Sequence, residues 1–529
     1  MRGRMIDPPN SKNLPDVPSD PEPTGPPISP PVSPPEASPG SSSDSPKKPC
    51  IRVSPGNLHL STAEAERLLA DTGRYFISAS SLVRIIDRDG KGVSTERVHE
   101  QTLKTVLSDM IDWERQGRDG VGVRCDPHPG VVQALLLGQD RHHLRPLAGL
   151  ARQPYYGPED LVAKPGYHAG TGVYGAFDAS DYQLDNPTRE LAELSLDYLN
   201  ALLSEFEFEA DADRSAALGA ILTAAIRASL SVAPAFSITA TSSGSGKSYL
   251  ADIISLFAGP EEPQRVSYPS SADEAGKLLL SILVENPGVV VFDDMQTNWK
   301  SLGPLNRALT SSTTTERVLG SNRTATVPTR ALFLGTGNNI EPERDLRRRV
   351  VSIRLAPRIE TPALRSFQHD PVGDTRTHRA RAVGCALTII GAYRASGRPL
   401  AQVPAIAGYE EWSGYCRQPL LWLGLPDPAQ SLINQVAHDP ERQSLAEFLE
   451  VWQRFFGSKS VTTRKLIAKA EQDSDLMEAL EELPVIDGRY VNRGRLGWFI
   501  SKNQGRRAGG LRIEPGDSSE RRSWRVVAD

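Results

Sequence analysis

The chain has 529 residues, of which 39% are hydrophobic, and a formal net charge of −5. This length exceeds what one hydrophobic core normally supports, so we expect about two or three folded domains joined by linkers. The modest negative charge excludes a uniformly basic protein, and any contact with nucleic acid must come from local basic clusters.

The four cysteines are far apart and form no CxxC pair, so we expect no zinc site. No run of about 18 apolar residues occurs, and the N-terminus lacks the apolar core of a signal peptide. We therefore expect a cytoplasmic protein with no membrane partner.

The chain before residue 232 divides by composition into three segments. Residues 1–50 are rich in Pro, Ser, Asp and Gly, which predicts a disordered tail. A PxxP-type ligand is one function that such a tail can have. Residues 51–186 have the texture of an α+β domain, with a capped helix at Ser61 or Thr62 and a strand pair in FISASSLVRIID. No chemistry is predicted for this domain. Helical periodicity in 187–231 predicts a helical connector.

Short apolar strands alternate with helices from residue 232 to residue 360, as in AFSITA, GVVVFDD, ALFLGT and VVSIRL. This alternation predicts an α/β core with a parallel sheet of buried strands. Residues 361–440 are predicted to form a helical lid. Residues 441–529 contain helices followed by LRIEP and SWRVV, which predict a hairpin and a domain like a winged helix.

The strand AFSITA is followed by TSSGSGKS and then by a helical pattern. This order of strand, glycine-rich loop and helix is typical of a phosphate-binding loop, although Thr241 stands where the pattern G-x-x-x-x-G-K-[ST] begins with glycine. Lys247 is predicted to contact the β and γ phosphates of ATP, and Ser248 to hold Mg²⁺. The loop residues predicted to approach the phosphates are Gly244, Ser245 and Gly246.

Two further strands end in polar side chains. Asp293 and Asp294 follow GVVVF, and Asn338 follows ALFLGTG. Because parallel strands present their carboxyl ends at one edge of a sheet, these side chains should lie beside the phosphate-binding loop. We expect Asp293 in the Mg²⁺ shell, Asp294 to orient or deprotonate the attacking water, and Asn338 to hold that water.

Arginines crowd ahead of the strand VVSIRL, at Arg344, Arg347, Arg348 and Arg349. Arg348 and Arg349 are the candidates for an arginine finger that reaches the ATP of a neighbouring subunit. Surface arginines paired with nearby acids are the alternative, and the sequence does not choose between the two fingers.

Two segments are candidate DNA-binding surfaces. VLGSNRTATV predicts a hairpin with Arg323 near its tip and Arg317 at its base, and a plain exposed hairpin is the alternative. From Val485 to Asp529, ten Lys or Arg stand against five Asp or Glu. A winged helix there would contact phosphates through basic residues, although many winged helices bind protein instead. The predicted contacts are Arg493, Arg495, Lys502, Arg506 and Arg507.

The order of these motifs resembles that of AAA+ ATPases. The paired acids and the TGNN sequence look most like superfamily 3 helicases, and residues 309–355 are similar to primase-helicase proteins of bacterial mobile elements. The departures are Thr241, Asp294 where many relatives have Glu, and His168 in a turn that usually carries Asp. The resemblance implies a hexameric ring that uses ATP and Mg²⁺ and grips single-stranded DNA in its pore.

The leading hypothesis is an ATP-driven DNA helicase or translocase in the replication of a mobile element. Residues 1–230 show no cluster of metal-binding acids for priming, so a separate primase or polymerase is the expected partner. The alternative is a DNA-binding initiator or scaffold whose ATP site works as a switch. A defence or transposition ATPase on the same core is a third reading.

Overall fold

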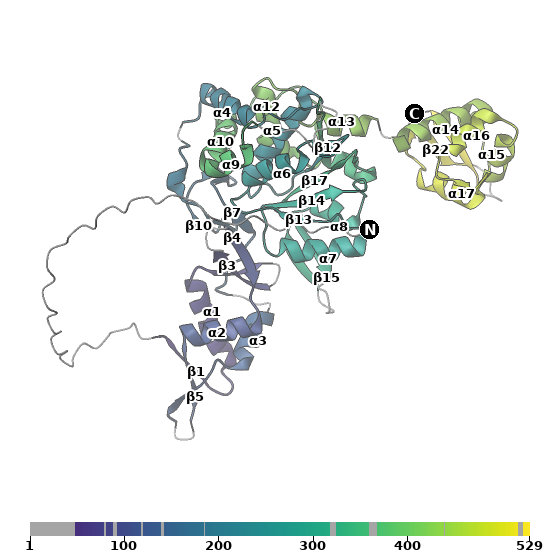
Figure 1. Cartoon of the computed structure of the whole chain (residues 1–529). Helices are drawn as coiled ribbons and strands as arrows, with labels where there is room; N and C mark the ends of the chain where they lie inside the picture. Colours follow the sequence, from purple (N-terminus) through teal and green to yellow (C-terminus); the bar gives the residue numbers. More distant parts are fainter. Residues whose placement is uncertain are drawn as a thin grey trace, which may run out of the picture. The chain divides into compact units, whose positions relative to one another are not determined.

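The computed structural model describes residues 48–78, 81–87, 92–117, 120–138, 142–184, 186–317, 324–358, 368–438, 440–516 and 522–528. Almost all of the predicted tail 1–50 therefore lies outside the described residues. The chain divides into a unit Met1–Lys48 and a unit Pro49–Asp529. The elements below all belong to the second unit, which is coloured from purple to yellow in Figure 1.

The N-terminal elements combine small sheets with three helices. One antiparallel sheet contains β2 (Tyr75–Ser78), β3 (Ser81–Asp87) and β4 (Val93–Arg97), and this confirms the strand pair predicted in FISASSLVRIID. The strand β1 (Cys50–Val53) pairs with β5 (Asp112–Gln116), which also pairs with β6 (Gly122–Arg124). The helices are α1 (Leu58–Asp71), α2 (Glu100–Met110) and α3 (Pro129–Leu137). The first helix begins three residues before Ser61, and Asn57 precedes it without a side-chain cap.

Short strands and two helices connect these elements to the central sheet. The strands are β7 (Gly149–Ala151), β8 (Tyr155–Tyr156), β9 (Leu161–Val162), β10 (Gly166–His168) and β11 (Val173–Gly175). The helices are α4 (Arg189–Leu202) and α5 (Asp211–Ala225). Thr188 caps α4, because its side chain accepts a hydrogen bond from the N–H of Leu191.

The central sheet has five parallel strands in the order β13-β14-β17-β12-β18. The predicted α/β fold class with a parallel sheet is therefore confirmed. The bounds are β12 (Ala235–Ala240), β13 (Gln264–Val266), β14 (Val289–Met295), β17 (Leu332–Asn338) and β18 (Val350–Leu355). The sequence did not indicate β13, because QRV contains one apolar residue and no apolar run.

Alternate side chains of each strand enter different cores, as the two-residue period of a strand requires. On β14, Val289 and Val291 join a core with α4, α5 and α6 (Lys247–Leu256), whereas Val290 and Phe292 join a core with α7 (Ala272–Leu283) and α8 (Gly303–Ala308). Figure 1 shows these two groups of helices on opposite sides of the sheet. Both faces of the strands are covered, which explains why they read as continuous apolar runs.

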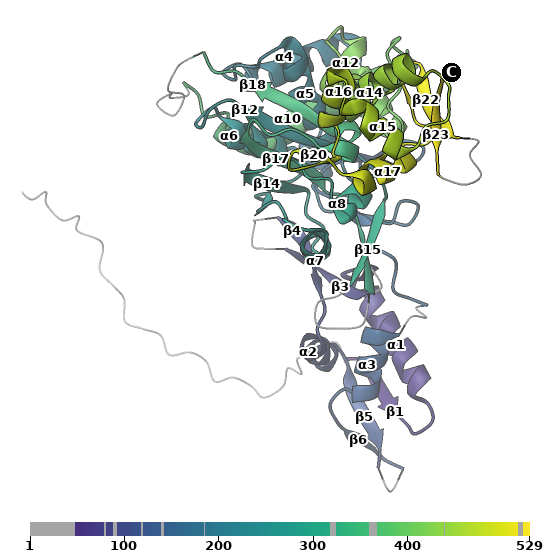
Figure 2. The same cartoon turned by 90° about the vertical axis from the view of Figure 1, so that its right-hand side faces the viewer.

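A hairpin of β15 (Thr313–Arg317) and β16 (Thr324–Pro328) packs against α7 and α8. Figure 2 shows its two strands projecting away from the central sheet. The connecting residues 318–323 lie outside the described part of the chain.

Helices that follow the sheet share its core. Buried residues of α10 (Arg379–Ala395) and of the segment 406–432 join the cluster that holds α4, α5 and α6. The other elements in this region are η2 (Arg344–Arg348), α9 (Pro371–Thr377), α11 (Glu410–Trp412), the π-helical η4 (Ser413–Arg417), α12 (Gln418–Trp422) and α13 (Gln430–Ala437).

The C-terminal elements have a separate hydrophobic core that includes Trp452, Leu496 and Val526. The helices are α14 (Pro440–Phe456), α15 (Thr463–Ala470), α16 (Ser474–Glu481) and α17 (Arg493–Lys502). The strands are β19 (Ile486–Asp487), β20 (Tyr490–Val491), β21 (Arg507–Ala508), β22 (Leu511–Pro515) and β23 (Trp524–Ala528). The strands β22 and β23 pair antiparallel, as predicted from LRIEP and SWRVV. Over the residues that the structure describes, no helix has both the length and the apolar character needed to cross a membrane.

Candidate nucleotide site at the carboxyl edge of the sheet

The glycine-rich loop joins the end of β12 to the start of α6. Gly244 and Gly246 have φ angles of 73° and 89°, in the left-handed region that glycine adopts without strain. Gly246 also stands at the N-cap and provides no capping side chain for the first amides of α6. Thr241 lies outside the left-handed region, so its position does not demand glycine. The loop and the helix N-terminus therefore suit an anion.

Lys247 lies over this loop and reaches the neighbouring strand. Its Nζ donates hydrogen bonds to Asn338 Oδ1 at 2.7 Å, to Ser245 Oγ at 3.0 Å and to the Ser242 carbonyl at 3.0 Å. Burial lowers the pKa of Lys247, and the negative charge of Asp294 counteracts part of the shift. The ammonium group is thus held by neutral oxygens that phosphate oxygens can replace.

Asp293 is fixed by hydrogen bonds from side chains on two strands and one helix. Its Oδ1 accepts from Thr336 Oγ1 at 2.6 Å and from Ser248 Oγ at 3.2 Å, and its Oδ2 accepts from Arg265 at 2.6 Å. Burial by itself raises the pKa of Asp293, but the hydrogen bond from Thr336 and the charge of Arg265 outweigh burial and lower the pKa below its usual value. The carboxylate is therefore ionised at neutral pH.

A bulge at the end of β14 separates the two acids. The pairing of β14 with β17 shifts register between Phe292 and Met295, and Asp294 has a φ angle of 47°. The Asp294 N–H donates to Thr336 Oγ1 at 3.0 Å, and its side chain is exposed. A bulge points consecutive side chains in different directions, which leaves Asp293 to face Ser248 while Asp294 remains near Lys247.

The structure brings together all the site residues predicted from the loop and from the two neighbouring strand ends. Asn338 is the last residue of β17 and lies opposite Ala240 of β12, directly before the loop. Sequence reasoning missed Thr336 and Arg265. Thr336 stands two residues before Asn338 on the same strand, so that alternation was a usable signal, whereas Arg265 belongs to the strand that was not predicted.

Arg348 and Arg349 lie at the opposite edge of the sheet. They precede β18, and the Ala235 N–H at the start of β12 donates to the Arg349 carbonyl at 2.9 Å. The strands β12 and β18 pair over six residues, a span of about 17 Å. Neither arginine therefore reaches the loop of its own chain. Arg348 forms an exposed ion pair with Asp345 at 3.1 Å, as the surface-arginine alternative expects.

The predicted DNA-binding residues are distributed over two regions. Arg317 is exposed at the end of β15, and Arg323 lies outside the described residues. The five C-terminal residues are exposed on and after α17. Arg495 donates to the Ile486 carbonyl at 2.6 Å, and Lys502 lies 4.9 Å from the centre of the Trp498 ring. Trp498 is 62% exposed, and the sequence analysis did not single it out.

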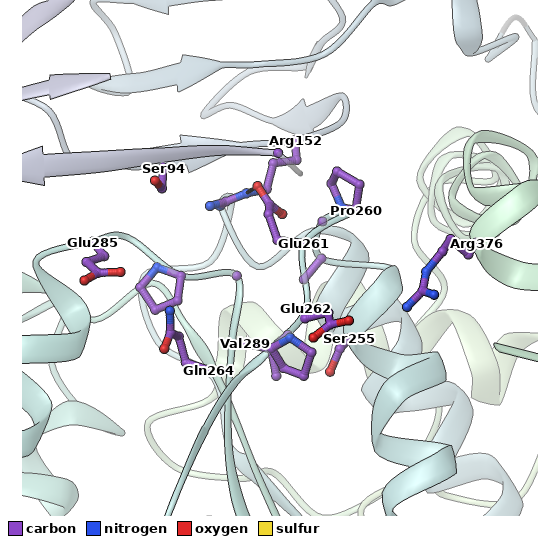
Figure 3. Close-up of a pocket in the computed structure, with 16 residues that line it drawn as sticks. Ser94, Arg152, Ser255, Pro260, Glu261, Glu262, Gln264, Glu285, Val289 and Arg376 are labelled. Carbon is purple, nitrogen blue, oxygen red and sulfur yellow. Dashed lines mark hydrogen bonds and ion pairs between the residues drawn. The ribbon is translucent and has the colours of Figure 1, made fainter. Parts of the chain in front are cut away.

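A cavity of about 450 Å³ lies at the other end of the strands, where Gln264 begins β13 and Val289 begins β14. Figure 3 shows Arg152 and Glu261 pointing toward each other in this cavity. Their side chains form an ion pair of 2.6 Å, and Arg152 also donates to the carbonyls of Val93 and Asn286. These contacts, which we call the joint, connect the start of β4 at Val93 with the loops of the sheet at Glu261 and Asn286. The cavity is separate from the nucleotide site.

The fold and the site define an α/β protein whose glycine-rich loop, lysine and strand-end acids suit a magnesium-bound nucleotide. The loop amides and Lys247 match the charge of phosphates. The Ser248 hydroxyl and the Asp293 carboxylate are oxygen ligands of the kind that Mg²⁺ prefers.

No protein-family model matches the chain, and no curated protein matches it. Similar solved structures include the apo C-terminal region of NrS-1, with a TM-score of 0.35, 9% identity and coverage of 88% of this chain and 100% of that one. They also include the helicase of JCV, with a TM-score of 0.18, 15% identity and coverage of 46% of this chain and 68% of that one. These scores are too low for the likenesses to support a conclusion about fold or function.

Proposed function

We propose that the chain is an ATPase of the AAA+ type that moves along or unwinds DNA in the replication of a mobile element. One observation carries the proposal: Lys247 meets Asn338 at 2.7 Å while Ser248 meets Asp293 at 3.2 Å. A phosphate-binding lysine, a polar strand end and a metal-binding acid thus share one edge of the sheet. The chain would act in the cytoplasm.

Each side chain in the site has a role that follows from its position. The loop amides of Gly244 to Gly246 and Lys247 would bind phosphates, and Ser248 and Asp293 would hold Mg²⁺, which neutralises charge on the phosphates when bound. Asp294 would orient or deprotonate the attacking water from its exposed position on the bulge. Asn338 would hold the same water, because an amide adds no negative charge there.

Assembly into a homo-hexameric ring is part of the proposal. Arg348 and Arg349 lie about 17 Å of strand away from the loop of their own chain, so they would complete the site of a neighbouring copy. The hairpin with Arg317 and Arg323 would grip single-stranded DNA in the pore. The C-terminal elements would form a winged helix that binds duplex DNA through α17, and a separate primase or polymerase would make primers.

Strand displacement on a forked duplex tests the proposal. We expect ATP-dependent displacement by the intact chain and none by Lys247→Ala, because the alanine chain lacks the phosphate contact. An intact, assembled chain that hydrolyses ATP and never displaces a strand would contradict helicase activity.

The exposed Trp498 beside Lys502 favours a second candidate, an ATP-switched initiator or scaffold that binds duplex DNA. Single-stranded DNA would stimulate the ATPase of a helicase strongly. An initiator would bind duplex DNA and ATP with slow turnover that a single strand does not change.

A further inference from the structure

A cavity of about 490 Å³ lies within the N-terminal elements, for which the sequence indicated no chemistry. Its walls come from the end of α1, the start of β2, residues 142–145 and β10. Basic and aromatic side chains dominate the lining, and Asp71 adds one acid. The basic and aromatic side chains of the lining are Arg67, His142, His143, Arg145, Tyr75, Phe76 and Tyr167. The volume falls in the range of about 300–1,000 Å³ that is usual for ligand sites.

A buried glutamate fixes the segment that carries three of the basic residues. Glu66 is 3% exposed, and its Oε1 accepts hydrogen bonds from the N–H groups of His142, His143 and Leu144, each at 3.0 Å. The Ile77 N–H donates to the Arg145 carbonyl at 2.9 Å. The backbone is therefore held from two sides while the side chains of His142, His143 and Arg145 stay exposed. Pre-ordered contacts lose little entropy when a ligand binds.

Aromatic rings form the floor of the cavity. The Arg145 guanidinium lies 5.3 Å from the centre of the Tyr167 ring, and the Phe76 ring lies 5.3 Å from the same ring. The Tyr167 hydroxyl donates to the Pro146 carbonyl at 2.8 Å, which fixes the ring. An arginine over an aromatic ring offers a cation for phosphate and a flat surface for a base.

The charge of the lining is uneven. Arg67 is neutralised by Glu64 at 2.7 Å and by Asp71 at 2.8 Å. Within the described ranges, no carboxylate forms an ion pair with Arg145. The positive charge available to a ligand therefore lies on Arg145, and the imidazole rings of His142 and His143 line the cavity on the same segment.

We propose that this cavity binds single-stranded nucleic acid, with Arg145, His142 and His143 on its phosphates and Tyr167 beneath a base. This inference rests on the proposed function, because the strand would be the one on which the ATPase acts. It gives the N-terminal elements a task that ATP hydrolysis does not require.

Fluorescence anisotropy of a labelled oligothymidine with the full chain, without ATP, tests this proposal. We expect Arg145→Glu to raise Kd about tenfold, because a phosphate contact is lost. The slope of log Kd against log salt concentration should fall by about one. The matched control is Arg115→Glu, since Arg115 is exposed on β5 and does not line the cavity. Equal affinities of the two variants would overturn the proposal.

Two further measurements use the unmutated chain. Photocrosslinking of a thiothymidine oligonucleotide should label residues 142–145 or Tyr167, and crosslinks confined to other segments would overturn the proposal. Thymidine monophosphate at the same nucleotide concentration should not displace the oligonucleotide; displacement would assign the cavity to a free nucleotide instead.

Basal ATP hydrolysis separates this inference from the proposed function. Arg145→Glu should hydrolyse ATP at the rate of the unmutated chain, because Arg145 is outside the nucleotide site. A chain that hydrolyses no ATP and still binds the strand through Arg145 would contradict the proposed function alone.

Discussion

Thr336 links both acids of the nucleotide site with one hydroxyl group. It donates to Asp293 Oδ1 and accepts from the Asp294 N–H, at 2.6 and 3.0 Å. A residue that orients metal ligands in this way contributes to activity without touching the substrate. Its place on β17 beside β14 is a consequence of strand order, which the sequence does not specify.

We expect Thr336→Val to weaken Mg²⁺ binding by about 10- to 100-fold, because valine keeps the shape and removes both hydrogen bonds. ATP hydrolysis would then need a correspondingly higher Mg²⁺ concentration. The Mg²⁺ concentration for half-maximal hydrolysis is the measurement. Thr313→Val, at an exposed position of the hairpin, is the control, and an equal effect of both changes would exclude the assigned role.

A substitution of Asp294 can remove its carboxylate without disturbing the positive φ angle of the bulge. Asparagine also tolerates a positive φ angle, so Asp294→Asn should melt within a few degrees of the unmutated chain. We expect hydrolysis to fall about 100-fold or more, as for the loss of a general base, while nucleotide binding persists. Undiminished turnover by Asp294→Asn would show that the reaction does not use this carboxylate.

Among the elements, strands that form a continuous apolar run were predictable from the sequence. Elements and contacts that depend on pairing with distant segments were not. The strands β12, β14, β17 and β18 are buried on both faces and were predicted. The short strand β13 has no such run, so Arg265 and its contact with Asp293 were invisible. The same limit hid the joint between β4 and the loops of the sheet, because its partners are far apart in the chain.

The joint holds a buried charge, since the Arg152 side chain is 5% exposed. Arg152→Ala should lower the free energy of unfolding by about 3–5 kcal/mol, because Glu261 loses its partner in a partly buried site. Denaturant unfolding measures the effect. Arg84→Ala, which breaks a more exposed pair with Glu96, should cost less than about 1 kcal/mol, and similar losses would argue against a special role for the joint.

At the scale of the whole molecule, the distance between the arginines and the loop makes the proposed assembly testable. Lys247→Ala disables the loop, and Arg348→Ala or Arg349→Ala disables the candidate finger. Mixing a loop variant with a finger variant should restore part of the ATPase activity, because some interfaces then combine an intact loop with an intact finger. The arginine whose variant is rescued is the finger, and no rescue with either would contradict a shared site.

The positions of the loop and of the arginines at opposite edges of the parallel sheet also restrict the symmetry of the proposed assembly. A contact that joins the amino edge of one sheet to the carboxyl edge of the next uses two different surfaces, so it cannot be made by a two-fold axis. Repetition of such a contact closes into a ring or continues as a filament, and every copy faces the same way. A protein built in this manner has two different faces. A DNA strand that passes through it would have the same 5′ to 3′ orientation relative to every subunit.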